Sequence, residues 1–214
     1  MTVGAIMLAH IAWKDDHLTI TSARSKTDQC GEFSFPRSIY ANPDEPAICP
    51  ILSLAVYVIS RPFRNEGIHP ALFDGPDQAD RYSKILGDVL SQLPDSMASH
   101  LGAQRGDIGT HSARKGAPTF ALSIPGGPSP VSIFLRAGWS LGNVKDRYIF
   151  AGEGGDQLCG RAVCGLSLMD SRFGVLPPHF TDDLLNTITD QDWRRILPGY
   201  ESYPECFRQA CSIF

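Results

Sequence analysis

The 214-residue sequence lacks several features that would assign it to a specialised class of protein. It has no apolar run long enough to span a membrane, no internal repeat and no composition typical of disorder. The apolar stretch near Met1 is short and is interrupted by His10, so the sequence shows no signal peptide. These absences predict a globular intracellular protein, nuclear if the cell is eukaryotic.

The sequence also lacks an overall excess of positive charge. Its 19 Lys and Arg residues are outnumbered by 23 Asp and Glu residues, for a formal net charge of −4. This balance excludes a protein whose entire surface attracts nucleic acid. Residues 101–150, however, contain six basic and two acidic side chains, whereas residues 151–214 contain five and nine. Basic charge is therefore concentrated in one segment, as a phosphate-binding surface requires.

Histidines that would complete a zinc site are missing beside the cysteines. Cys159/Cys164 and Cys206/Cys211 form two pairs with the same spacing. Four residues separate the members of each pair, which is more than the usual two, and no matched histidines flank them. The sequence therefore predicts reduced thiols that are buried or idle, with no metal and no other cofactor.

The first third of the chain is expected to contain a helix and a small antiparallel hairpin. Residues 1–12 are apolar from the start and are interpreted as the second half of a buried helix. Residues 17–23 and 33–41 alternate between apolar and polar positions, which is typical of strands. The turn between them, at residues 25–31, would carry Lys26 at or near the tip of the hairpin.

Helical patterns dominate the rest of the chain. The sequence predicts a buried helix that is apolar all round at 48–59, one or two helices at 80–101 interrupted near Pro94, a helix at 112–122 with Arg114 in its first turn, a helix at 131–137 stopped by Gly138, and a short helix at 144–150. The fold class is thus mainly α with a small antiparallel β-sheet, α+β. Residues 1–150 are expected to form one domain, and residues 151–214 an acidic, partly irregular extension.

Three short motifs combine side chains that suit the cleavage of a phosphodiester. His111 and Arg114 lie in THSARKGA (110–117), Trp139 in GWS and Tyr148 in DRYI. A tyrosine that attacks a phosphodiester needs the charge of the phosphate to be neutralised and its own proton to be removed. These residue types supply both functions without a metal ion.

The motifs resemble the catalytic domain of tyrosine recombinases, the phage-integrase family, and in particular the Crypton-type recombinases of eukaryotic mobile elements. The resemblance rests on THSARKGA, LRAGWSLGNVKDRYI and NPDEPAICPILSLAVY, and it covers roughly residues 1–165. In that family a lysine on a β-hairpin precedes a His-x-x-Arg motif, a His or Trp, and a nucleophilic Tyr nine residues later. Here Lys26 takes the first place, and Trp139 and Tyr148 are nine residues apart.

The resemblance, together with the chemistry, assigns a role to each residue. Tyr148 is the nucleophile that forms a 3′-phosphotyrosine; a free tyrosine has a pKa of about 10, so it needs assistance. Arg114 binds the non-bridging oxygens, His111 acts as acid/base or phosphate donor, and Trp139 donates its indole N–H to the same phosphate. Lys26 acts as general acid toward the departing 5′ oxygen.

The same resemblance implies partners and weaker contacts. Double-stranded DNA is the expected substrate, with Lys115, Lys145 and Arg147 as further phosphate contacts. Arg136 is interpreted as a solvated or phosphate-backbone residue. Active relatives work as DNA-bound multimers, and residues 151–214 are the candidate segment for exchange between protomers.

One residue of the family pattern is absent, because no arginine precedes Arg24. The family uses a second phosphate-binding arginine before the hairpin, and losing one such donor lowers the rate on the order of 10²- to 10³-fold. The usual N-terminal DNA-binding arm is missing as well. Two explanations stay open, an N-terminally truncated sequence or a decayed copy.

Three alternatives to an active recombinase follow from this absence and from the shared chemistry. The chain is then a non-catalytic DNA-binding remnant, a relative of type IB topoisomerases, or a helical interaction domain with no role on nucleic acid.

Overall fold

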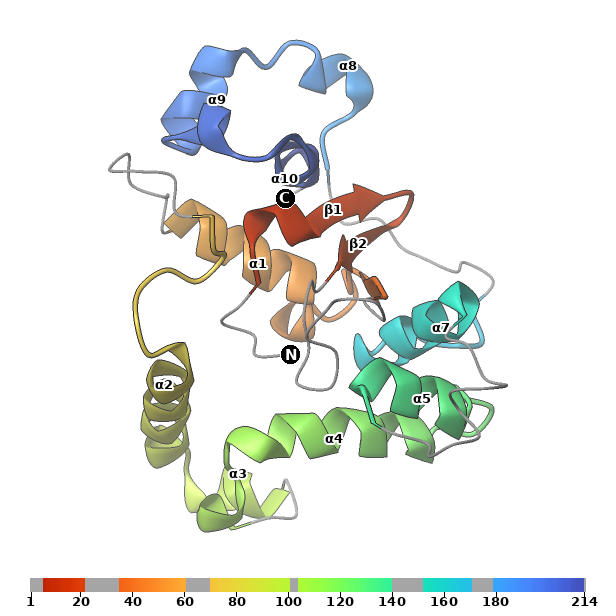
Figure 1. Cartoon of the computed structure of the whole chain (residues 1–214). Coiled ribbons are helices and arrows are strands. Elements are labelled where there is room, and N and C mark those ends of the chain that lie inside the picture. Colours follow the sequence, from red (N-terminus) through yellow and green to blue (C-terminus); the bar gives the residue numbers. More distant parts are fainter. Residues whose placement is uncertain are drawn as a thin grey trace.

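The computed structural model describes residues 6–21, 35–60, 70–100, 104–139, 152–170 and 179–213. Within these ranges the protein is mostly helical, with a three-stranded antiparallel sheet in the middle of the molecule (Figure 1). The α+β class predicted from the sequence is confirmed at this level. In the same ranges, every helix is too short or too polar to cross a membrane.

The strands are β1 (Ile11–Lys14), β2 (His17–Ile20) and β3 (Arg37–Ile39). The helices are α1 (Pro50–Ser60), α2 (Gln78–Gln92), α3 (Asp95–His100), α4 (Thr110–Ser123), α5 (Pro130–Ala137), α7 (Glu153–Val163), α8 (Asp182–Leu185), α9 (Asp190–Ile196) and α10 (Glu205–Cys211). Short 3-10 helices lie at Leu8–His10, Pro46–Ile48, Arg105–Asp107 and Tyr200–Ser202.

The sheet has the order β1-β2-β3, and both pairs of strands are antiparallel. Leu18 of β2 lies opposite Ile39 of β3, which confirms the predicted pairing of residues 17–23 with residues 33–41. Lys14 lies opposite His17, so β1 and β2 are joined by a two-residue turn. Asp15 in this turn has a φ of 51°, which an Asp tolerates better than most residues.

The helix expected over residues 1–12 is wrong for the described residues 6–12, which form an isolated bridge, a 3-10 turn and the beginning of β1. An apolar run without polar interruptions carries no period that separates a helix from a buried strand. Residues from Ile11 onward form a strand because Ile11 pairs with Ile20 of β2 and is fully buried there.

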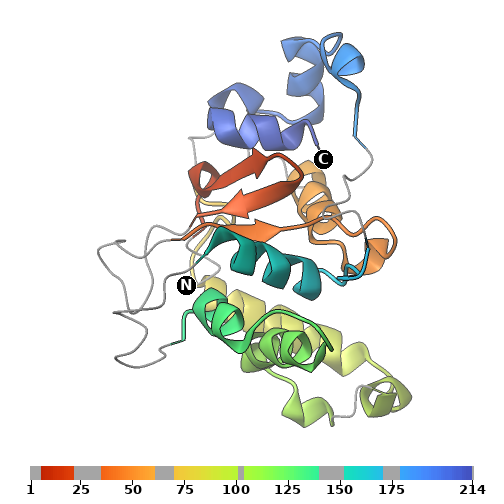
Figure 2. The ribbon, with the colours of Figure 1, turned by 90° about the vertical axis from the view of Figure 1, so that its right-hand side faces the viewer.

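The sheet lies between two helical layers (Figure 2). On one side, α1 and α10 share a core with the strands, and this core includes Ile11, Leu18, Ile51, Val58 and Phe207. On the other side, α7 packs against β3, with α4 and α5 beyond it (Figure 2). A Cβ on Gly160 would lie 2.4 Å from the carbonyl oxygen of Ser38, so only glycine permits this approach of α7 to the sheet.

Two helices from the segment 151–214, α7 and α10, contribute to the two layers. The inner surface of α7 carries Cys159 and Ala162, and that of α10 carries Phe207 and Ala210; all four are buried. The acidic composition of this segment reports its solvent-facing side chains and says nothing of these buried faces.

The helices predicted at 48–59, 80–101, 112–122 and 131–137 are present but differ in detail, and the helix predicted at 144–150 lies outside the described residues. The break near Pro94 separates α2 from α3, as expected. Helix α1 is not buried all round: one face holds Ile51, Ala55 and Val58, whereas Ile48, Leu52, Val56 and Ile59 are 45–57% exposed. Helix α4 begins at Thr110, so Arg114 lies in its second turn and not in its first.

Candidate functional site

Helices α4 and α5 form a helical hairpin that carries three of the predicted site residues. Ala121 of α4 packs with Ile133 of α5, and the loop between the helices spans residues 124–129, so the two helices are antiparallel. Ser129 begins α5 as its N-cap by accepting a hydrogen bond from the Ser132 N–H at 3.1 Å. Gly138 ends α5 in a left-handed conformation with a φ of 69°.

The first turns of α4 extend beyond the end of α5. At 1.5 Å per residue, 14 residues span about 21 Å and the eight residues of α5 about 12 Å. We call residues 110–117 of α4 the overhang; all of these residues except Ser112 are exposed. In Figure 1, α4 reaches from α5 toward α2 and α3.

The overhang presents the His-x-x-Arg motif to solvent. His111, Arg114 and Lys115 have the spacings i, i+3 and i+4, which place Arg114 and Lys115 next to His111 on the helix surface. None of the three side chains makes a hydrogen bond or an ion pair with another residue of the described ranges. Pro118 lacks the N–H that would bind the Arg114 carbonyl oxygen, so helix α4 is weakened at this position.

Trp139 follows the last turn of α5. It therefore lies toward the end of the helical hairpin that is opposite the loop, as the overhang does. Its backbone N–H donates to the Phe134 carbonyl oxygen at 2.9 Å, and the centroids of the two rings are 5.5 Å apart. The indole is half-buried against α5. His111, Arg114 and Trp139 thus all lie away from the loop of the hairpin, but the overhang extends about 9 Å beyond the end of α5, and no contact joins Trp139 to His111 or Arg114.

Four of the predicted site residues, Lys26, Lys145, Arg147 and Tyr148, lie outside the described residues.

A pocket of ≈ 580 Å³ lies between the sheet, α5 and the beginning of α7. Its wall is formed by Lys14, Thr19, Thr21, Phe35, Pro36, Arg37, Ser38, Val131, Ser132, Leu135, Arg136, Gly152, Glu153, Gly155 and Asp156. Within the described part of the chain, this pocket combines charged groups from four elements, β1, β3, α5 and α7.

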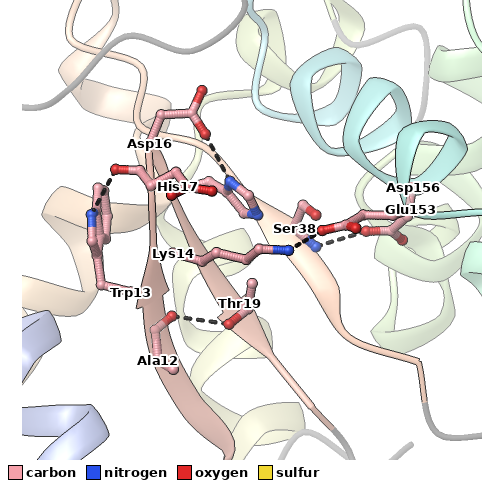
Figure 3. A network of polar contacts seen from close by, with 10 residues as sticks. Ala12, Trp13, Lys14, Asp16, His17, Thr19, Ser38, Glu153 and Asp156 are labelled. Atoms are coloured by element: carbon pink, nitrogen blue, oxygen red, sulfur yellow. Dashed lines mark hydrogen bonds and ion pairs between the residues drawn. The ribbon is translucent and has the colours of Figure 1, made fainter.

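Two arginines and one aspartate form the polar centre of the pocket. Arg136 Nη1 lies 2.7 Å from Asp156 Oδ1, and Arg136 Nη2 donates to the Ser38 carbonyl oxygen at 2.9 Å. The Ser38 N–H in turn donates to Asp156 Oδ2 at 2.7 Å (Figure 3). Arg37 Nη1 is farther from Asp156 Oδ1, at 4.0 Å. These contacts connect β3, α5 and α7 through side chains.

Burial has a larger effect on the pKa of Arg37 than the carboxylate of Asp156 does. Removal from water lowers the pKa of its guanidinium, while Asp156 opposes this shift and Arg136 adds to it. The side chain is 25% exposed, and its Nη2 donates to the Leu135 carbonyl oxygen at 3.3 Å.

An exposed ion pair between Lys14 and Glu153 lies at the rim of the pocket (Figure 3). The hydrogen bond from Lys14 lowers the pKa of Glu153, and Glu153 raises the pKa of Lys14. Both side chains are about half exposed, so this pair contributes little to stability.

His17 in the neighbouring strand belongs to the core and not to the pocket. It is 1% exposed, its Nδ1 lies 2.8 Å from Asp16 Oδ1, and its ring centroid is 5.0 Å from that of Tyr40. Figure 3 shows this pair beside the β1–β2 turn, where the Trp13 indole N–H donates to the Asp15 carbonyl oxygen at 3.0 Å.

The described residues beside the segments of Lys26 and Tyr148 line the same pocket. Thr21 and Phe35 flank residues 22–34, and Gly152 follows residue 151. Lys26 is five residues from Thr21, and Tyr148 is four residues from Gly152. The chain therefore enters and leaves the Lys26 segment at the wall of this pocket, and it leaves the Tyr148 segment there.

The sequence interpretation missed Arg37 and Asp156. Of its two readings of Arg136, the solvated one is wrong, because the side chain is 17% exposed and lies against Asp156, whereas the phosphate contact stays a prediction. Arg136 and Asp156 are 20 residues apart in two different helices. No local period or spacing connects them, so the pair is visible only after α5 and α7 pack on β3.

Comparison of this chain with protein-family models, curated proteins and solved structures gives no match. In the described ranges no group of three or more His, Cys, Asp or Glu residues could hold a metal ion. The five cysteines that lie in these ranges are free thiols, and four of them are buried.

Proposed function

We propose that this protein breaks and rejoins double-stranded DNA with the chemistry of a tyrosine recombinase, in the context of site-specific recombination or integration. The proposal rests on the motifs of the sequence and on one structural observation, the shared pocket wall beside the segments of Lys26 and Tyr148. The exposure of His111 and Arg114 on α4, where both can reach a ligand, is compatible with it.

The reaction balances without a metal ion or a nucleotide cofactor. The Tyr148 oxygen attacks phosphorus, its proton passes to His111, and the bond from phosphorus to the 5′ oxygen breaks. Lys26 protonates the departing oxygen, while Arg114 and the Trp139 indole N–H bind the non-bridging oxygens. The 3′-phosphotyrosine keeps the energy of the broken bond, so a free 5′ hydroxyl rejoins the strand by the reverse step.

A suicide substrate tests this chemistry directly. A nicked duplex that loses its 5′ fragment after cleavage should leave a covalent protein–DNA adduct on a denaturing gel. The adduct should disappear in Tyr148→Phe and persist in Tyr82→Phe, a matched change at an exposed tyrosine of α2. An adduct that survives Tyr148→Phe, or no adduct even with an upstream extension that restores an arginine, would rule out strand transfer.

A second function, DNA binding without cleavage, is favoured by the exposed cations of the overhang. Affinity for duplex DNA should then fall steeply with salt and be unchanged in Tyr148→Phe. Arg114→Gln should reduce the slope of log affinity against log salt by about 1.

Arg194→Gln on α9 is the matched control, since it removes an exposed arginine that pairs with Glu201. It should leave the slope unchanged. A flat salt dependence in the unmodified protein would contradict both proposed functions.

A further inference from the structure

Among the described residues, the wall of the pocket between the sheet, α5 and α7 holds one positive charge more than its carboxylates compensate. Its wall contains the cations Lys14, Arg37 and Arg136 and the anions Glu153 and Asp156. Lys14 and Glu153 pair with each other at the rim. In the described part of this wall, Asp156 is thus the carboxylate that remains for two guanidinium groups.

Asp156 is committed to Arg136. Its Oδ1 lies 2.7 Å from Arg136 Nη1, against 4.0 Å from Arg37 Nη1. Its Oδ2 accepts the Ser38 N–H at 2.7 Å. Oδ1 accepts no hydrogen bond of good geometry, but it is much nearer to Arg136 than to Arg37, so the carboxylate mainly compensates the charge of Arg136.

Arg37 consequently has neutral hydrogen-bond partners where a counter-ion is needed. Its guanidinium donates to the carbonyl oxygens of Phe35 at 3.2 Å and Leu135 at 3.3 Å. These bonds use two of its five N–H groups. A charge that is three-quarters removed from water is costly unless an opposite charge lies close to it.

We propose that this pocket binds one phosphodiester group, with the guanidinium of Arg37 as the principal ligand. A phosphodiester carries one negative charge, which matches the single uncompensated positive charge, whereas a dianion would be repelled by Asp156 and Glu153. The fork of N–H donors on arginine fits two non-bridging oxygens at once. The volume of ≈ 580 Å³ leaves room for sugars on either side of the phosphate.

The DNA backbone is the favoured source of this group, and that part of the inference rests on the proposed function. Arg37 would then provide a second guanidinium for the DNA backbone, in addition to that of Arg114. It lies on β3, only 11 residues after Lys26. Free inorganic phosphate is the competing source of the same chemistry.

The test uses the whole protein labelled with ¹⁵N, in which the Nε–H signal of Arg37 is assigned through bonds. Titration with the dinucleotide d(TpT) should shift this signal in a saturable manner, and inorganic phosphate should do so more weakly. The Nε–H signal of Arg194, an exposed arginine paired with Glu201, should not move. Equal or absent shifts at Arg37 and Arg194 would overturn the proposal, whether or not any variant folds.

Variants of Arg37 then identify the source of the phosphate. Arg37→Gln should weaken d(TpT) and duplex DNA binding by about 10- to 100-fold, the usual effect of losing a charged hydrogen bond. Arg37→Lys should lose less, because it keeps the charge, and Arg194→Gln should match the wild type. Loss of phosphate binding with unchanged duplex binding would assign the pocket to free phosphate and overturn the DNA source.

The results for the Arg37 pocket can be told apart from a failure of the proposed strand transfer. A protein that forms no Tyr148 adduct but still shows the saturable Arg37 shift would lose the proposed reaction and keep this pocket. A protein that forms the adduct equally well in Arg37→Gln, with no Arg37 shift, would keep the reaction and lose the pocket.

Discussion

Asp156 is the residue on which the polar contacts of the pocket depend. It accepts the backbone N–H of Ser38 and lies against Arg136, which itself donates to the Ser38 carbonyl oxygen. One side chain of α7 and one of α5 therefore satisfy both backbone groups of the same residue of β3. Buried backbone groups need such partners, and here they receive them from charged side chains.

Replacement of the Asp156 carboxylate should isolate the positive charge of Arg136. Asp156→Asn keeps the shape and an oxygen that can accept the Ser38 N–H, but it leaves Arg136 without a counter-charge. We expect a loss of about 2–3 kcal/mol in the free energy of unfolding, somewhat below the cost for a fully buried pair. Urea denaturation measures this loss.

The control is Asp183→Asn, which changes an exposed carboxylate of α8 and should cost less than about 0.5 kcal/mol. In the double variant Arg136→Gln/Asp156→Asn, the two losses should be less than additive, because no unpaired charge remains. Equal stability of Asp156→Asn and the wild type would show that the contact between α7 and β3 is not electrostatic.

At the scale of elements, α7 is placed by one glycine. A Cβ on Gly160 would lie 2.4 Å from the Ser38 carbonyl oxygen and 3.3 Å from the Tyr40 ring. The backbone of α7 therefore approaches β3 closely, and this approach brings Asp156, one turn earlier in the helix, to the strand. The close approach at Gly160 therefore determines both how α7 packs on β3 and where Asp156 lies in the pocket.

Two glycine substitutions in different helices should have opposite effects. Gly160→Ala forces α7 away from a backbone oxygen and should destabilise the protein by about 1–3 kcal/mol or more. Gly87→Ala in α2 places a methyl group where no atom lies within 4 Å, so it should stabilise by up to about 1 kcal/mol.

Urea midpoints of both variants and the wild type provide the measurement. A neutral or stabilising Gly160→Ala would mean that α7 does not pack against β3 as the structure shows.

At the scale of the whole molecule, the sheet is covered on both faces by helices that follow it far along the chain. Helix α10 packs on β1, and Phe207 and Cys211 join the core of Ile11 and Leu18. Burial raises the pKa of the Cys211 thiol to about 12 and that of Cys159, on the other side of the sheet, to about 11. Both helical layers thus contain a thiol that resists ionisation only while the protein is folded.

This difference predicts a loss of stability at alkaline pH. Above pH 9.0, the ordinary pKa of a thiol, the unfolded chain releases these protons and the folded protein keeps them, so the free energy of unfolding decreases as pH rises. Each group contributes up to about 1.4 kcal/mol per pH unit between its unfolded and folded pKa. Urea denaturation at several pH values from 8 to 11 should show this decline.

Cys211→Ala and Cys211→Val test the cause. Their packing volumes differ, so their stabilities at pH 8 should differ too, but both lack the thiol and should show the same shallower decline. A decline as steep as that of the wild type would exclude ionisation of Cys211 as its source.

Local signals in the sequence determined a substantial part of this protein. Periodicity and turn residues predicted the pairing of β2 with β3, the break at Pro94 and the end of α5 at Gly138, because each depends on neighbours within a few residues. The order of His111, Arg114, Trp139 and Tyr148 likewise needs no fold to be read, and it is the basis of the proposed chemistry.

Tertiary structure alone decided where those signals lie in space and which charges meet. Strand β1 forms because Ile11 pairs with Ile20, and one face of α1 stays exposed because a helix on a core buries a single face. Arg136 pairs with Asp156, which follows it by 20 residues. Arg37 lies 4.0 Å from the same carboxylate, although about 120 residues separate the two in the chain. Such contacts form when helices and strands pack together. They join residues that are far apart in the sequence, and patterns among neighbouring residues therefore do not reveal them.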